Sequence, residues 1–141
     1  REASKTIFKS GVTVRKLFAI LSISALFLTG CGSSDSTTNQ SVGDFAKTIS
    51  DESVVVLDVR TSGEFAAGHI SNSINIDVET GEFANQVANL DKTKTYAIYC
   101  QSGRRSAIAA SQMAKLGFTS LYNLNGGIGA WAGAGQTVVQ D

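Results

Sequence analysis

The chain has 141 residues, of which 43% are hydrophobic and 17% are charged, with twelve basic and twelve acidic side chains. This size is enough for one domain, and the balance excludes a disordered acidic or basic protein and provides no overall attraction to nucleic acid. Two cysteines and one histidine exclude a disulfide framework and an all-cysteine zinc site, so we expect neither a metal nor another cofactor.

The first thirty residues have the composition of an export signal. A run of apolar and small residues at 17–28 follows Arg15 and Lys16. As a helix, the run would span about 18 Å, which is too short to cross a bilayer core of about 30 Å. We therefore predict a secretory signal peptide at residues 1–30, with a buried helix as the alternative. Residues 1–13 are an unusual preface to such a signal, so we expect them to precede the true start of translation.

Cys31 ends the sequence Leu28-Thr29-Gly30-Cys31, which resembles the lipobox of bacterial lipoproteins. The resemblance implies that Cys31 receives a diacylglyceryl group and becomes the first residue of the mature chain. A free or disulfide-bonded cysteine is the alternative. Gly32 stands where aspartate retains lipoproteins in the inner membrane of enteric-type bacteria, so an exported lipoprotein on the periplasmic face of the outer membrane is favoured. In a Gram-positive cell, the same anchor would hold the protein on the outer surface.

The stretch after Cys31 has a different composition from the rest of the chain. Residues 32–41 contain no apolar side chain, so we expect residues 31–41 to form a lipidated, flexible tether. The folded domain is then predicted at residues 42–141. Without residues 1–30, seven basic and eleven acidic residues remain, which gives a net charge of −4.

Within the predicted domain, apolar and β-branched runs alternate with segments of helical periodicity. The predicted strands are 54–59, 73–77, 95–100 and 121–124, with a fifth near Val42. The predicted helices are 44–50, 81–90 and 106–116, the last ended by Gly117. A tight turn between a strand and a helix is predicted at Gly126-Gly127. This alternation predicts an α/β fold with a mainly parallel sheet, in which ligands bind at the carboxyl ends of the strands.

One such strand end carries Cys100, in the sequence Tyr99-Cys100-Gln101-Ser102-Gly103-Arg104-Arg105-Ser106. The loop leads into a predicted helix, whose N-terminus favours a negative charge. Gly103 lets successive backbone N–H groups turn inward to bind an anion, and two arginines add positive charge. Each feature favours the thiolate, so we predict a lowered pKa for Cys100 and an ionised thiol near neutral pH. A buried, inert cysteine is the alternative interpretation.

Together with five other stretches, this loop resembles the single-domain rhodaneses over residues 42–132. The matching stretches, in the order of the family, are Leu57-Asp58-Val59-Arg60, Glu64-Phe65 with Gly68-His69-Ile70, Ile74-Asn75-Ile76, the Cys100 loop, Gly117-Phe118, and Leu124-Asn125-Gly126-Gly127-Ile128 with Ala130-Trp131. The resemblance implies a rhodanese-like α/β fold, with a five-stranded parallel sheet flanked by helices, and the chemistry of a thiosulfate sulfurtransferase.

The resemblance also implies a role for each residue of the Cys100 loop. Cys100 would attack the sulfane sulfur of a donor such as thiosulfate, carry it as a persulfide, and pass it to a thiol or to cyanide. The backbone N–H groups from Gln101 through Arg105 would hold the bound sulfur, and Arg104 and Arg105 would attract a dianionic donor. No general base is needed if the thiol is already ionised. We expect a monomer, attached to a membrane by its lipid, with no nucleic-acid partner.

Asp58 and Arg60 are predicted to support the site from the end of a neighbouring strand. Arg60 is expected to pair with Glu64 and to order the loop beside the cysteine. A partly exposed ion pair that contributes little is an equally good interpretation. His69 is expected to be a hydrogen-bonded structural residue rather than a base, because one histidine without a nearby partner is a poor base.

Two other functions compete with sulfur transfer. Cysteine phosphatases share a related fold but need five residues between the cysteine and the arginine, whereas only four separate Cys100 from Arg105. The shorter loop suits one sulfur better than a tetrahedral phosphate, which disfavours a phosphatase. A non-catalytic rhodanese-like module that carries sulfur or binds a partner is the stronger alternative. The physiological donor and acceptor are left open by the sequence.

Overall fold

The computed structural model describes residues 36–140 as five strands and five helices. In chain order they are β1 (Thr37–Gln40), α1 (Val42–Ile49), β2 (Val55–Asp58), α2 (Ser62–Ala67), β3 (Ser73–Asn75), α3 (Phe83–Ala88), β4 (Tyr96–Tyr99), α4 (Arg104–Lys115), β5 (Leu121–Leu124) and α5 (Gly127–Gly133). The predicted signal peptide, Cys31 and the first part of the tether lie outside the described residues. Within those residues, no helix has both the length and the apolar character needed to span a membrane.

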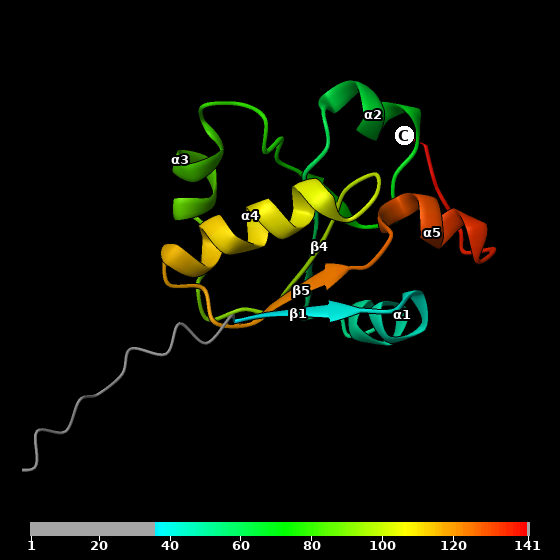
Figure 1. Cartoon of the computed structure of the whole chain (residues 1–141), viewed down its shortest axis with the longest axis horizontal. Helices are drawn as coiled ribbons and strands as arrows, with labels where there is room; N and C mark the ends of the chain where they lie inside the picture. The colour runs from blue at the N-terminus through cyan, green and yellow to red at the C-terminus, as the bar shows by residue number, and fades with distance from the viewer. Residues whose placement is uncertain (1–35, 141) are drawn as a thin grey trace, which may run out of the picture. The chain divides into compact units, whose positions relative to one another are not determined.

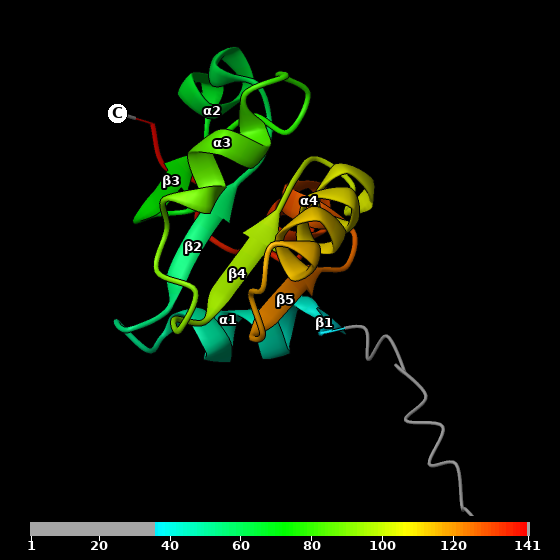
Figure 2. The same ribbon diagram turned by 90° about the vertical axis from the view of Figure 1, so that its left-hand side faces the viewer.

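All five strands run parallel in one sheet, in the order β1-β5-β4-β2-β3. Figure 2 shows the strands side by side, with β1 and β3 at the two edges. The predicted α/β fold with a mainly parallel sheet of about five strands is therefore confirmed. Strand β4 lies at the centre and is buried at every position, because helices cover both faces of the sheet.

The hydrophobic core consists of two clusters, one on each face of the sheet. Alternate residues of β4 point to opposite faces, so Tyr96 and Ile98 join one cluster while Ala97 and Tyr99 join the other. Helices α3 and α4 cover the first face, and α1 and α5 cover the second (Figure 1). This packing holds the carboxyl end of β4, where Cys100 follows, between α4 and α5.

The position of strand β1 differs from two expectations, the extent of the flexible tether and the place of the fifth strand. Its residues, Thr37–Gln40, fall within the predicted flexible tether, and the fifth strand was expected near Val42. Val42 instead begins α1, whose N-cap Ser41 accepts a hydrogen bond from the Asp44 N–H at 3.2 Å. The tether prediction is wrong for residues 37–40, because β1 is a polar edge strand. Backbone pairing with β5 holds it in the sheet, and the middle two of its four side chains are exposed.

Helix α2 has no counterpart among the predicted helices. It has six residues and none of them is buried, so no apolar periodicity marks it. Its sequence signal is a capping box, in which the Thr61 side chain accepts from the Glu64 N–H and the Glu64 carboxylate accepts from the Thr61 N–H. Helix α4 was expected from residue 106 but begins at Arg104. Both arginines of the Cys100 loop therefore lie in its first turn.

Candidate active site

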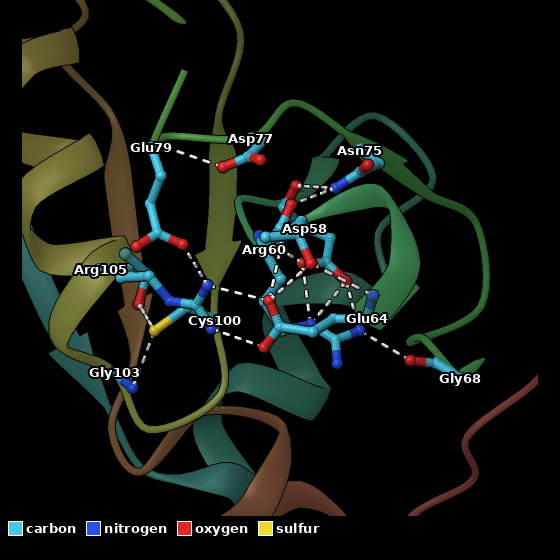
Figure 3. A network of polar contacts seen from close by, with 12 residues as sticks. Asp58, Arg60, Glu64, Gly68, Asn75, Asp77, Glu79, Cys100, Gly103 and Arg105 are labelled. Carbon is cyan, nitrogen blue, oxygen red and sulfur yellow. Dashed lines mark hydrogen bonds and ion pairs between the residues drawn. The ribbon is translucent and has the colours of Figure 1, made fainter. Parts of the chain in front are cut away.

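Cys100 directly follows β4 at the carboxyl edge of the sheet, and only 1% of its surface is exposed. Its Sγ accepts hydrogen bonds from the Gly103 backbone N–H at 3.1 Å and from the Ser106 hydroxyl at 3.3 Å (Figure 3). Burial raises the pKa of Cys100, but hydrogen bonds from Ser106, Ser102 and Gly103 outweigh burial and lower the pKa below the ordinary thiol value. The direction agrees with the predicted thiolate.

Ser106 is a further residue of the site, to which the sequence had suggested no role. It is fully buried in the first turn of α4, its hydroxyl donates to the sulfur at 3.3 Å, and its backbone N–H helps to lower the pKa of the thiol. The sequence feature that could have identified Ser106 is a hydroxyl side chain at the start of the helix that follows the cysteine. Of the predicted backbone donors, Gly103 donates to the sulfur at 3.1 Å, and Ser102 helps to lower the pKa of the thiol. Gln101 and Arg104 are exposed residues.

The start of α5 holds the backbone of the Cys100 loop. The Ile128 N–H donates to the Cys100 carbonyl at 2.8 Å, and the Gly129 N–H donates to the Gln101 carbonyl at 3.1 Å. This close approach depends on the turn before α5, where Gly127 has a φ of +59°. The predicted tight turn is confirmed, and it brings helix amides against the loop that carries Cys100.

Asp58 and Arg60 form a buried ion pair beside the site. The Arg60 guanidinium donates to the Asp58 carboxylate at 2.6–3.0 Å, and the two side chains are 5% and 0% exposed. Arg60 also donates to the Gly68 carbonyl at 2.6 Å, and Asn75 donates to the carbonyls of Asp58 and Arg60. The expectation that Arg60 pairs with Glu64 is wrong, because the α2 capping box turns Glu64 toward α4 instead.

Glu64 pairs with Arg105, and Glu79 joins the same guanidinium. Arg105 reaches Glu64 at 2.7 and 2.9 Å and Glu79 at 2.8 Å. Figure 3 shows the guanidinium between the two carboxylates. Arg105, which was expected to attract the donor together with Arg104, is thus ion-paired within the fold. The hydrogen bond from Arg105 lowers the pKa of Glu64 to about 2 despite some burial.

His69 is held by polar and aromatic contacts in the loop after α2. Its Nδ1 lies 3.0 Å from the Phe65 carbonyl, its ring stacks on Phe65 at 3.8 Å, and its backbone pairs with Val139. These contacts agree with the predicted hydrogen-bonded structural role. Among residues 36–140, histidine, cysteine and carboxylate side chains form no cluster of three that would hold a metal ion.

The family model of the Rhodanese-like domain matches residues 41–134. The chain belongs to this family. This rhodanese-like chain is 30% identical over 91 residues to the thiosulfate sulfurtransferase GlpE of Shewanella oneidensis, covering 64% of this chain and 88% of that protein. It is 33% identical over 88 residues to a sulfurtransferase of Allochromatium vinosum, covering 62% of this chain and 80% of the relative. The rhodanese-related protein of Thermoplasma volcanium matches the structure with a TM-score of 0.65 at 34% identity, over 74% of this chain and 99% of that one.

The pair between Glu64 and Arg105 predicts a pH-dependent contribution to the stability of the rhodanese-like domain. We expect Glu64→Gln to lower the free energy of unfolding by about 1–2 kcal/mol at pH 7, a value reduced for solvent screening of a partly exposed pair. Because the folded-state pKa of about 2 lies below the unfolded value of 4.5, the contribution is complete above pH 4.5 and is lost as the pH falls toward 2.

Urea unfolding of wild type and Glu64→Gln at pH 7, 4.5 and 3 measures this loss. The two stability curves should converge as the pH falls. Glu82→Gln is the control, since the Glu82 carboxylate accepts a hydrogen bond from Asn85 instead of an arginine. A difference between Glu64→Gln and wild type that stays constant from pH 7 to pH 3 would contradict the assignment.

Proposed function

We propose that this rhodanese-like domain is a sulfurtransferase that moves a sulfane sulfur from a donor such as thiosulfate to a thiophilic acceptor through a persulfide on Cys100. The observation that carries the proposal is the pair of donors to Sγ, the Gly103 N–H and the Ser106 hydroxyl. These groups favour a thiolate nucleophile at rest and a negatively charged persulfide sulfur after transfer. The sulfurtransferase names of two relatives agree with this chemistry.

The reaction needs two displacements at sulfur. The Cys100 thiolate attacks the outer sulfur of thiosulfate, a new S–S bond forms, and sulfite leaves with the electron pair of the broken bond. A thiolate or cyanide then attacks the outer sulfur of the persulfide, and Cys100 leaves as the thiolate. Atoms and electrons balance in each step, and no general base is required. Cys100 is the only cysteine between residues 36 and 140, so the acceptor must come from outside this domain.

The intact mass of the purified protein after treatment with thiosulfate tests this proposal. We expect a gain equal to one sulfur atom, which cyanide then removes as thiocyanate. Cys100→Ala should gain no sulfur and should form no thiocyanate above the rate of the uncatalysed reaction. Equal thiocyanate production by wild type and Cys100→Ala would contradict the proposed activity.

The same experiment separates an enzyme from a sulfur carrier or partner-binding module. A carrier would gain one sulfur but would turn over slowly when donor and cyanide are both in excess. The enzyme is expected to produce many equivalents of thiocyanate per Cys100. Production that stops after a single equivalent would favour the carrier function instead.

We also propose that the domain works outside the cytoplasm as a lipoprotein anchored through Cys31, with the outer membrane favoured. The support is the sequence of residues 15–32, with its basic start, short apolar run and lipobox-like end. A mature chain isolated from cells with an unmodified Cys31, or with residues 1–30 attached, would contradict this proposal.

A further inference from the structure

The positive charge of Arg105 is shared between two carboxylates. Its Nη1 donates to Glu79 at 2.8 Å and to Glu64 at 2.9 Å, and its Nη2 donates to Glu64 at 2.7 Å. Arg105 directly precedes Ser106, whose hydroxyl bonds to the sulfur of Cys100. Any donor that reaches Cys100 therefore approaches an arginine whose charge is already balanced.

Carboxylates offset part of the positive charge beside Cys100. Arg104 is the other arginine of the loop, and within residues 36–140 it has no carboxylate partner. Asp77 adds a further carboxylate beside Glu79, since it accepts a hydrogen bond from the Glu79 N–H at 2.8 Å. Two arginines thus lie among three carboxylates, and an ionised Cys100 adds another negative charge. Thiosulfate carries two negative charges, so each of these carboxylates weakens the attraction that the arginines exert on it.

Glu64 and Glu79 differ in the hydrogen bonds that their carboxylates accept besides those from Arg105. The Glu64 carboxylate also accepts hydrogen bonds from the N–H and hydroxyl of Thr61, so it is part of the α2 cap. The Glu79 side chain is 58% exposed and lies in the loop before α3, and the contact that holds its carboxylate is Arg105. Removing the charge of Glu79 leaves the two-point pair between Glu64 and Arg105 in place. Glu79 can therefore act on the donor through charge with little effect on the fold.

We propose that Glu79 determines donor specificity: by sharing Arg105 with Glu64, it disfavours dianionic thiosulfate relative to sulfane-sulfur donors that carry one negative charge or none, such as thiosulfonates and organic persulfides. The inference depends on the proposed sulfur transfer through Cys100. It assigns Glu79 to the selection of the donor, while the bond-making steps at Cys100 stay the same for each donor.

The test compares two donors in wild type and Glu79→Gln, with cyanide as the acceptor. Thiosulfate is the dianion. Benzenethiosulfonate carries one negative charge and transfers its outer sulfur in the same way, with benzenesulfinate leaving with the electron pair of the broken S–S bond. In Glu79→Gln, we expect the ratio of kcat/KM for thiosulfate to kcat/KM for benzenethiosulfonate to rise about three- to tenfold at low salt, mainly through KM. At about 1 M salt the ratio should return toward the wild-type value, because salt at that concentration screens charges that are more than about 3 Å apart.

Glu82→Gln is the matched control, because it removes the same charge three residues later from a carboxylate that bonds to Asn85. We expect the donor ratio of Glu82→Gln to stay within about twofold of wild type, since the Glu82 carboxylate bonds to Asn85, whereas Glu79 bonds to Arg105. Equal changes toward both donors in Glu79→Gln, or an equal ratio shift in Glu82→Gln, would overturn the assignment of Glu79.

A second measurement does not depend on sulfur transfer. Iodoacetate is an anion and iodoacetamide is neutral, and both alkylate a cysteine thiolate. The ratio of their rates at Cys100 should rise in Glu79→Gln and stay at the wild-type value in Glu82→Gln. An unchanged alkylation ratio in Glu79→Gln would overturn the inference even if the enzyme is active. A raised ratio with no sulfur transfer from either donor would instead refute the proposed function, and with it the selection of donors.

Discussion

Arg60→Met is expected to lower the free energy of unfolding by about 3–5 kcal/mol, because it leaves a buried carboxylate without its partner. Asp58 is fully buried and accepts three hydrogen bonds from the Arg60 guanidinium at 2.6–3.0 Å. The substitution also removes the donor to the Gly68 carbonyl and the cation over the Tyr99 ring, which lies 5.7 Å from the guanidinium carbon. Methionine fills much of the volume, so the loss reports mainly on charge and hydrogen bonding.

Urea unfolding at pH 7 measures the effect, and Lys47→Met is the matched control. Lys47 also pairs with an aspartate, Asp44 at 3.4 Å, but the two side chains are 82% and 60% exposed. Exposed pairs contribute little, so Lys47→Met should change stability by less than about 0.5 kcal/mol. The double variant Asp58→Leu/Arg60→Met should recover most of the stability lost in Arg60→Met, because no charge is left buried. A loss below about 1 kcal/mol for Arg60→Met would show that Asp58 is not held by this pair.

Gly127→Ala is the second substitution with a large expected effect, because the new methyl group has no room. A Cβ at this position would lie 2.4 Å from the Cys100 carbonyl oxygen and 2.6 Å from the carbonyl carbon and oxygen of Gln101. All three contacts are to backbone, and the φ of +59° adds a cost for any residue other than glycine. We expect a loss of about 2–5 kcal/mol in stability, together with displacement of the Cys100 loop.

Gly133→Ala provides the control at the other end of α5, where a Cβ would meet nothing within 4 Å. That change should be neutral or slightly stabilising, by up to about 1 kcal/mol. If Gly127→Ala still folds, its thiocyanate production should fall more than its stability explains, because the cysteine loop must move to admit the methyl group. Wild-type activity and stability in Gly127→Ala would contradict the close contact between α5 and the loop.

The central strands of this fold were predictable because a strand that is buried on both faces needs a continuous run of apolar residues. Strands β2 and β4 are covered on both faces, so they occur as continuous apolar and β-branched runs at 54–59 and 95–100. The edge strand β1 has no such signal, since the chain pairs it with β5 through backbone groups that any residue carries. Helix α2 was missed for a related reason, because none of its residues is buried.

The local geometry of the Cys100 loop was predictable for the same reason. A cysteine, a glycine with φ of +94° and the first turn of a helix follow one another within seven residues, so their geometry depends little on the rest of the chain. The partners of the arginines were not predictable, since Arg105 pairs with residues 26 and 41 positions earlier. Arg60 had two carboxylates within four residues, and the direction of α2 decided between them.

The amino-acid sequence by itself determined the α/β class, the order of most of its elements and the cysteine loop with its helix N-terminus, because hydrophobic period and turn chemistry act between near neighbours. The tertiary structure decided which charges around that loop are available. Arg60 is used within the fold by Asp58, and Arg105 is shared by Glu64 and Glu79, so the positive charge counted in the sequence is largely balanced where a donor would approach. Ion pairs depend on distances between side chains that are remote in the sequence, and only the packing of α2 and the loop before α3 against α4 sets those distances.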